Sequence, residues 1–284
     1  MQAYLCVAQV RDVGPTAAWR SSRRTHYDLL ALILANGCRV SPLLTAVPWI
    51  DSRCFRIDWL HCADQGVTAD FLANLMLMAM NKLPGGSAKQ RCLSLWGRLQ
   101  EWYTEQKVEE RLQNLVLTML KQPGKSPKLR SSAAQCRALV PFGLKLSRDL
   151  LDASDGMEST ARHAMNHLSQ CYVSLSDSSI FFADALREHS TKFALLYCAL
   201  ETTATNDWSW RVKPKLHMFL ELCSEGSRPA TFWTYRDEDF GGSVSRLSRR
   251  RGGPLRAKAF SSNLLQRFKT VSYTHLTLPT KRIV

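Results

Sequence analysis

The chain has 284 residues, 45% of them hydrophobic, and its 38 Lys and Arg against 24 Asp and Glu give a net charge of +14. This length suffices for one large domain or two smaller ones. The charge favours an anionic partner, with nucleic acid first, a membrane surface second, and simple solubility as the alternative. Because no apolar run approaches the length of a membrane-spanning helix, we expect no transmembrane segment and no membrane among the partners.

The spacing of the cysteines indicates in which cellular compartment the protein resides. The nine cysteines are scattered singly, with no Cys-x-x-Cys pair, at positions 6, 38, 54, 62, 92, 136, 171, 198 and 223. This pattern predicts reduced, mostly buried thiols rather than disulfides or a zinc site. The first residues also lack the basic stretch of a signal peptide. We therefore expect an intracellular protein, nuclear or cytoplasmic.

Residues 1–67 are expected to form part of an α/β core. The apolar run Leu29–Leu34 is followed by Pro42 and Pro48, which push their preceding residues out of the helical region. This indicates a strand or helix edge followed by extended chain. Phe55–Trp59 alternates apolar and polar side chains over the length of a strand, so a strand is predicted there.

Residues 68–204 are expected to form a helical domain. Between Thr68 and Asn81 the apolar residues recur at helical spacing, and Pro84-Gly85-Gly86 ends the segment. The same spacing predicts further helices at Ala88–Glu105, Val108–Lys121, Ser132–Leu151, Met157–Ser174 and Ile180–Thr202. The predicted fold class is mainly α, with this helical domain inserted in or following the partial α/β core.

Residues 205–270 are expected to form a C-terminal helical segment. Pro214 suits the first turn of a helix that reaches Cys223. The acidic run Asp237–Asp239 suits the start of another helix, where carboxylates meet unpaired amides and the positive end of the helix dipole. The densest basic cluster of the chain, Arg246–Arg256, follows it.

Residues 271–284 look unlike a natural structural element. Val271–Thr280 resembles a translated adapter sequence of the kind used in sequencing libraries, and a genuine Thr-rich tail is the alternative. We expect this tail to pack against nothing, and the chain to be a fragment of a longer protein. Its removal takes away only Lys281 and Arg282, so the basic charge belongs to the rest of the chain.

Three groups of residues are candidates for chemistry. The first is Asp58, His61 and Asp64, at the predicted junction between strand and helix. Open α/β sheets bind ligands at such junctions, and carboxylate oxygens suit Mg²⁺. The alternative is that Asp64 caps a helix and that Asp58 is structural.

The second group lies around the predicted Pro214 helix. Lys213 and Lys215, near its start, are predicted to hold phosphate. His217 and Glu221 are four residues apart and share a helix face, which is at most half of a zinc-protease pattern because the second His is lacking. The alternative is a surface helix with one partly buried His.

The third group combines the acidic run with the basic cluster. Basic side chains there are predicted to neutralise nucleic-acid phosphates without reading sequence, and they are Arg246, Arg249, Arg250 and Arg251. An ordinary ion-paired face with an N-terminal cap is the alternative. No Gly-x-Gly-x-x-Gly, Walker loop or Gly-x-Ser-x-Gly occurs, which disfavours nucleotide-binding folds and hydrolases.

Together, Asp58-x-x-His61-x-x-Asp64-x-Gly66-Val67, the long helical stretch, Lys213-Pro-Lys-x-His217 and the later acidic helix resemble the C-terminal half of an RNase H-like DDE transposase. The similarity extends to domesticated transposase-like proteins of protist genomes such as those of dinoflagellates. It covers roughly residues 41–269 and rests on short motifs.

The resemblance implies a catalytic centre of three carboxylates that bind two divalent ions, Mg²⁺, for phosphoryl transfer. Asp58 would be the second carboxylate and Glu238 the last, with Asp64, Glu221 and Asp239 as alternatives, and Asp58 and Glu238 would approach each other to share metal. The first carboxylate is missing or lies unrecognised near Asp12 or Asp28, so this chain is expected to be inactive.

Two other classes of function stay open. The chain is alternatively a non-catalytic, basic helical protein that binds nucleic acid or acts as an adaptor. It is otherwise a truncated gene product without function. The sequence does not indicate the oligomeric state.

Overall fold

The computed structural model describes residues 11–21, 25–51, 54–176, 180–205 and 209–249, and in these ranges the chain is helical with no β-strand. The predicted mainly α fold is therefore confirmed. The chain divides into two compact units, Met1–Trp233 and Thr234–Val284, and each is described by itself. The predicted tail, residues 271–284, lies outside the described residues.

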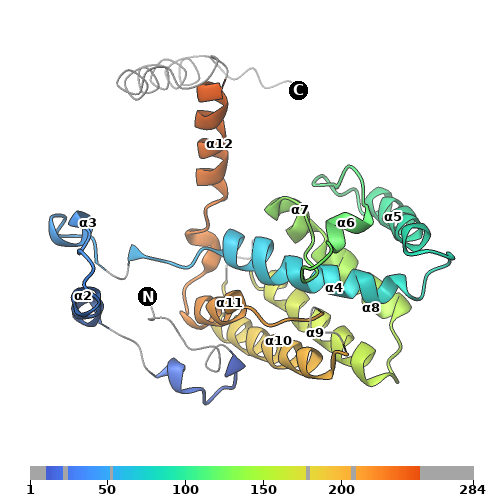
Figure 1. Cartoon of the computed structure of the whole chain (residues 1–284), viewed down its shortest axis with the longest axis horizontal. Helices are drawn as coiled ribbons and strands as arrows, with labels where there is room; N and C mark the ends of the chain where they lie inside the picture. The colour runs from blue at the N-terminus through green and yellow to red at the C-terminus, as the bar shows by residue number, and fades with distance from the viewer. Residues whose placement is uncertain (1–10, 22–24, 52–53, 177–179, 206–208, 250–284) are drawn as a thin grey trace. The chain divides into compact units, whose positions relative to one another are not determined.

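Helices dominate the first unit (Figure 1). A nine-residue π-helix, Leu60–Thr68, runs directly into α4. The α-helices of this unit are α2 (His26–Ala35), α3 (Pro42–Thr45), α4 (Ala69–Met80), α5 (Ala88–Glu105), α6 (Leu117–Leu120), α7 (Ala133–Ala138), α8 (Val140–Leu150), α9 (Gly156–Val173), α10 (Ala183–Thr203) and α11 (Pro214–Ser224). The second unit contains α12 (Tyr235–Arg249).

Helix α4 forms the centre of the core. It contacts the π-helix, α5, α6 and α8, and its Phe71, Leu72 and Leu75 side chains are fully buried. Gly143 of α8 permits the close approach of that helix, because an added Cβ would stand 2.6 Å from the Leu72 Cδ2 atom. Helix α9 packs along α10, and α10 packs on α11, which completes the unit around α4.

Helix starts follow the sequence signals closely. Helix α5 begins at Ala88, as predicted, because Ser87 and Gln90 form a reciprocal capping box. Pro214 occupies the first turn of α11, also as predicted. In the second unit, Asp237 and Glu238 lie in the first turn of α12, where a negative charge suits the helix dipole.

The strand predicted at Phe55–Trp59 is wrong. Residues 55–58 are neither helix nor strand, and the described residues offer no strand to pair with them. Trp59 instead leads into the π-helix and is fully buried, with its ring centroid 5.5 Å from that of Tyr172 and 5.6 Å from that of Phe219. The alternation does not mark a buried face, because Phe55 is exposed, Ile57 is half-buried and only Trp59 is buried.

Two predicted helices are also corrected. Over Val108–Lys121 only the short α6 is helical, and Leu112 and Leu115 pack into the core from irregular backbone. Ser132–Leu151 is divided into α7 and α8 at Leu139. Pro141 explains the break, because it lacks the backbone N–H that a continuous helix would need there.

The cysteines agree with the prediction of reduced thiols. All eight cysteines in the described ranges are free, and most of them are buried: Cys62, Cys92, Cys136, Cys171 and Cys223. Cys6 lies outside the described residues.

Candidate functional site

Asp58 holds the start of the π-helix. Its Oδ2 atom accepts a hydrogen bond from the backbone N–H of His61 at 2.9 Å and lies 2.6 Å from His61 Nδ1. The Asp58 side chain is 16% exposed, while that of His61 is half exposed. The carboxylate proposed as a metal ligand thus has a local structural role at the beginning of a helix.

Asp64 lies inside the core. Tyr172 donates its hydroxyl hydrogen to Asp64 Oδ1 at 2.5 Å, and Trp59 Nε1–H donates to the same oxygen at 3.3 Å. The Thr68 hydroxyl lies 2.7 Å from the Tyr172 oxygen and extends the network. Burial, and next the Asp64 charge, raise the pKa of Tyr172 well above its usual value. Asp64 is therefore a buried acceptor. The alternative that it caps the next helix is wrong, because no side-chain cap occurs at the start of α4.

His217 and Glu221 meet, as their helical spacing predicts. His217 Nε2 lies 2.9 Å from Glu221 Oε1, and the imidazole packs edge-on against Trp19 with ring centroids 4.4 Å apart. The His217 side chain is only 5% exposed. The residue is a buried histidine, but the alternative of a surface helix is wrong, because α11 packs against the π-helix and α10 and most of its side chains are buried.

Cys62 lies among these groups but is a poor nucleophile. Its thiol donates to the backbone oxygen of Lys215 at 3.4 Å. Burial raises the pKa of the Cys62 thiol to about 12, and the nearby carboxylates of Asp58, Glu221 and Asp64 add to the rise while Lys215 opposes it. The thiol stays protonated at neutral pH, so it does not supply thiolate chemistry.

The remaining predicted acidic ligands belong to the second unit. Glu238 and Asp239 lie in α12, whereas Asp58, Asp64 and Glu221 lie in the first unit. The predicted approach of Asp58 and Glu238 stays a prediction. In the described ranges, no group of three or more His, Cys, Asp or Glu side chains is placed to hold a metal ion.

The predicted basic cluster lies at the end of the described chain. Arg246 and Arg249 belong to α12, while Arg250 and Arg251 lie outside the described residues. Their phosphate-binding role stays a prediction.

Lys213 and Lys215 are held in place by the first unit. Lys213 Nζ lies 2.9 Å from Asp70 Oδ2, and Lys215 Nζ donates to the backbone oxygen of His61 at 2.7 Å. The chain before them is anchored to α4, because the backbone N–H of Trp210 donates to Asn74 Oδ1 at 3.0 Å. Both lysines thus occupy fixed positions at the start of α11.

A basic loop, residues 121–130, lies beside these lysines. Its turn, Gln122 to Lys125, has Pro123 second and Gly124 third at φ +67°, as a type II turn requires. The loop then runs back past α6, with the backbone N–H of Lys128 bonded to the Leu120 oxygen. This ten-residue loop contains four cations and no acid, which are Lys121, Lys125, Lys128 and Arg130.

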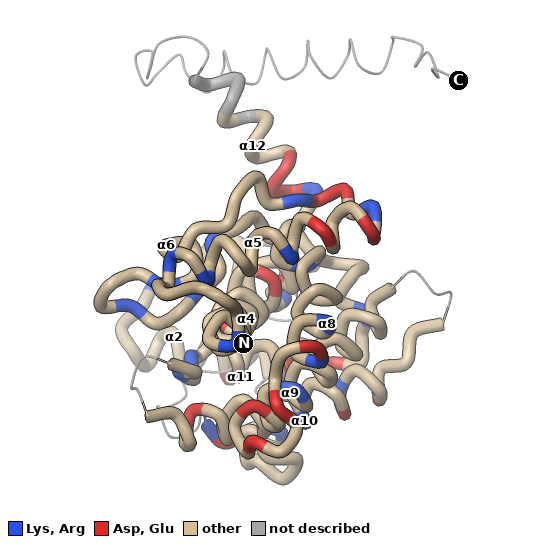
Figure 2. Tube along the Cα trace, turned by 90° about the vertical axis from the view of Figure 1, so that its right-hand side faces the viewer, with Lys and Arg blue, Asp and Glu red and all other residues tan. Residues whose placement is uncertain are grey.

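The end of this loop directs its charges outward. Pro127 and Leu129 are buried, whereas Lys128 and Arg130 are exposed, as expected for an extended segment whose alternate side chains face opposite sides. The backbone N–H of Leu129 donates to the Ala69 oxygen at 2.9 Å and fixes the loop to the start of α4. Lysines and arginines gather on the chain that follows α6 (Figure 2).

One buried carboxylate connects the loop to α11. Burial raises the pKa of Asp70, and the charges of Lys213, Lys128 and Lys215 oppose that rise. Burial in turn lowers the pKa of Lys128, with Lys215 and Lys213 contributing. The three lysines are therefore close neighbours although they come from distant parts of the sequence. We call the seven cations of both segments the basic surface: Lys121, Lys125, Lys128, Arg130, Arg211, Lys213 and Lys215.

Sequence reasoning found only part of this surface. Lys213 and Lys215 are predicted to hold phosphate, but no function is predicted for the chain between the expected helices Val108–Lys121 and Ser132–Leu151. The signal that was missed is four basic residues in ten without an acidic one.

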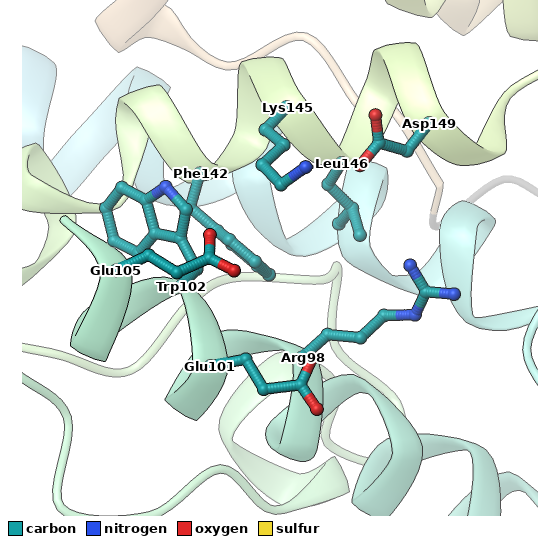
Figure 3. Close-up of a pocket in the computed structure, with 8 residues that line it drawn as sticks. All are labelled: Arg98, Glu101, Trp102, Glu105, Phe142, Lys145, Leu146 and Asp149. Carbon is teal, nitrogen blue, oxygen red and sulfur yellow. Dashed lines mark hydrogen bonds and ion pairs between the residues drawn. The ribbon is translucent and has the colours of Figure 1, made fainter.

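A groove lies between α5 and α8 (Figure 3). Its volume is about 140 Å³, and acidic and basic side chains mix along it: Arg98, Glu101, Trp102, Glu105, Phe142, Lys145, Leu146 and Asp149. Lys145 Nζ is paired with Asp149 Oδ2 at 2.9 Å. Sites for small organic ligands usually measure roughly 300–1,000 Å³. The groove is therefore a weaker candidate site than the basic surface.

Comparison with known proteins gives no relative: no family model, no curated protein and no solved structure matches this chain.

Proposed function

We propose that this protein binds the phosphate backbone of nucleic acid through the basic surface, without catalysing a reaction there. The observation that supports this most is the pairing state of the exposed loop cations. Within the described residues, Lys121, Lys125, Lys128 and Arg130 form no ion pair with an acidic side chain. Unpaired cations on a fixed scaffold are the groups that neutralise phosphates and release counterions.

The arrangement favours backbone contact over base readout. Lysine is a point-charge donor that binds phosphate without the planar, forked geometry that arginine uses to read guanine. Five of the seven cations of the basic surface are lysines: Lys121, Lys125, Lys128, Lys213 and Lys215. Binding is therefore expected to depend weakly on sequence and strongly on salt.

Neutralising the loop tests this function. We expect the variant Lys121→Gln/Lys125→Gln/Lys128→Gln to bind a duplex of about 20 base pairs at least tenfold more weakly than the wild type near 0.1 M salt. The plot of log affinity against log salt should become less steep by about 2–3, since each lost phosphate contact removes about 0.9. Fluorescence anisotropy with a labelled duplex measures both quantities.

A variant of equal charge provides the control. Lys89, Arg98 and Lys107 are exposed and lie away from the loop in sequence. Replacing these three with Gln lowers the net charge by the same amount, and binding should fall by less than about threefold. If both variants lose the same affinity, the general charge of the protein binds the nucleic acid and the basic surface has no special role.

Transposase-like phosphoryl transfer is the second candidate, with one observation in its favour. Asp58, Glu221 and Asp64 all raise the pKa of the Cys62 thiol, so three carboxylates lie within electrostatic range of one buried side chain, although they are not grouped to hold a metal ion within the described residues. In this proposal Asp58 and Glu238 of the chain bind Mg²⁺.

Divalent ion binding tests the second candidate. With Mn²⁺ as the probe, Asp58→Asn should weaken binding by at least about tenfold, while Asp149→Asn should leave it unchanged. Equal Mn²⁺ binding by the wild type and both variants would contradict a metal site at Asp58.

A further inference from the structure

Beyond its first turn, which contains His26 and Asp28, helix α2 is apolar on every side and yet has no buried residue. Its sequence from Leu29 to Ala35 contains only apolar side chains. A helix that is hydrophobic all round is normally enclosed by protein or by lipid. The described residues of the first unit leave Leu29, Leu30, Leu32 and Ile33 only half-buried, so contact with a further apolar phase would take these side chains out of water.

The chain after α2 also exposes apolar side chains. Helix α3 also lacks a buried residue, and Leu34 and Leu43 are exposed. Two aromatic side chains stand out, because Tyr27 is 80% exposed and Trp49 is 79% exposed. Exposed apolar groups gathered in one short stretch mark an interaction surface, whereas single ones are ordinary.

The charge of this segment favours an anionic lipid surface over a second copy of the chain as the partner. Arg20 and Arg56 are bonded to other residues of the first unit, but between them the sequence contains four Arg, two Asp and no Lys or Glu, so this stretch is still positively charged. Two copies of the stretch would bring like charges together, which disfavours self-association. The negative headgroups of an anionic lipid surface complement it.

We propose that residues 26–49 bind the surface of an anionic membrane, with α2 and α3 lying in the plane of the headgroups. Trp and Tyr favour this depth because their rings are apolar and carry one polar group. Ten residues of helix extend about 15 Å, roughly half the hydrocarbon thickness, so α2 lies on the bilayer rather than across it. No helix among the described residues is both long and apolar enough to cross a membrane. This inference goes beyond nucleic-acid binding and uses different residues.

Vesicle co-sedimentation tests it. We expect the protein to bind vesicles of phosphatidylcholine with about one-third phosphatidylserine and to bind pure phosphatidylcholine vesicles at least about tenfold more weakly. The variant Leu34→Ser/Leu43→Ser/Trp49→Ser keeps the charge unchanged. Its partition onto the anionic vesicles should fall by at least about tenfold, because the variant lacks three apolar side chains that would transfer from water into the bilayer.

Matched variants separate this segment from the rest of the surface. Val116, Val173 and Leu195 are also exposed apolar residues, and replacing them with Ser should leave vesicle binding within about twofold of the wild type. The Lys121→Gln/Lys125→Gln/Lys128→Gln variant should retain most vesicle binding, and the Leu34, Leu43 and Trp49 variant should retain duplex binding.

Three results would overturn the proposal. Equal partition of the wild type and the Leu34, Leu43 and Trp49 variant would show that charge alone attracts the protein to lipid. Absence of binding to either vesicle would exclude a membrane partner. A concentration-dependent dimer in analytical ultracentrifugation, lost in the same variant and accompanied by no vesicle binding, would assign the segment to self-association.

Discussion

Replacing Phe71 with Ala is expected to lower the free energy of unfolding of the first unit by about 3–5 kcal/mol. The Phe71 side chain is fully buried in α4. Its ring centroid lies 5.2 Å from that of Phe193, 5.3 Å from that of Trp210 and 5.9 Å from that of Tyr197. The substitution removes these ring contacts together and leaves a cavity where α4, α10 and the chain before α11 meet.

Urea denaturation followed by circular dichroism measures the decrease in the free energy of unfolding. The control is Phe182→Ala, because Phe182 is 65% exposed and the substitution removes the same atoms from a solvent-exposed site. That variant should stay within about 0.5 kcal/mol of the wild type. A loss below about 1 kcal/mol for Phe71→Ala would contradict the central position of α4 in the core.

Lys213→Met is expected to destabilise the protein by about 2–3 kcal/mol at neutral pH. Asp70 is the reason, since its side chain is 8% exposed and would lose the ammonium group 2.9 Å away. Asp70 Oδ1 already lacks a hydrogen-bond partner, so the carboxylate depends strongly on this ion pair. The expected loss is below the roughly 3–5 kcal/mol of a fully buried pair, because one-third of the Lys213 side chain is exposed.

The pH dependence identifies the cause of the loss. Burial raises the pKa of Asp70 above its ordinary 3.8, and removing Lys213 takes away the largest opposing influence. In the folded Lys213→Met variant Asp70 therefore holds a proton at pH values where the unfolded chain has lost it, so stability falls as pH rises through this window. The destabilisation should be complete above the raised pKa and should shrink as pH falls towards 3.8.

A double variant completes the test. In Lys213→Met/Asp70→Asn the buried charge is absent, and stability should return to within about 1 kcal/mol of the wild type. Thermal or urea denaturation at several pH values measures all three proteins. If Lys213→Met alone is as stable as the wild type at neutral pH, the ion pair contributes nothing to the fold.

Local signals in the sequence predicted the helices well. The boundaries of α5 follow from Ser87 and Gln90, and Pro214 marks the start of α11, because caps and prolines act within one turn of backbone. The same kind of evidence failed at Phe55–Trp59. Alternation is a local property, whereas a strand also needs a partner elsewhere in the chain.

The polar interior and the basic surface depend on contacts that no local pattern encodes. Tyr172 binds Asp64 across 108 positions of sequence, so a carboxylate that looked like a metal ligand lies buried in the core. Lys128 becomes a neighbour of Lys213 only because both approach Asp70. The sequence shows the charges, and the packing of the loop on α4 brings them together.

Lysine footprinting tests the central claim most directly. The free protein and its complex with the duplex are treated with an amine-acetylating reagent, and each modified lysine is located by mass spectrometry. We predict that Lys121, Lys125 and Lys128 are protected in the complex. Lys145 of α8 and Lys192 of α10, each paired with an acid on its own helix, should react equally in both. Unchanged acetylation of the three loop lysines in a fully bound complex would contradict nucleic-acid binding by the basic surface.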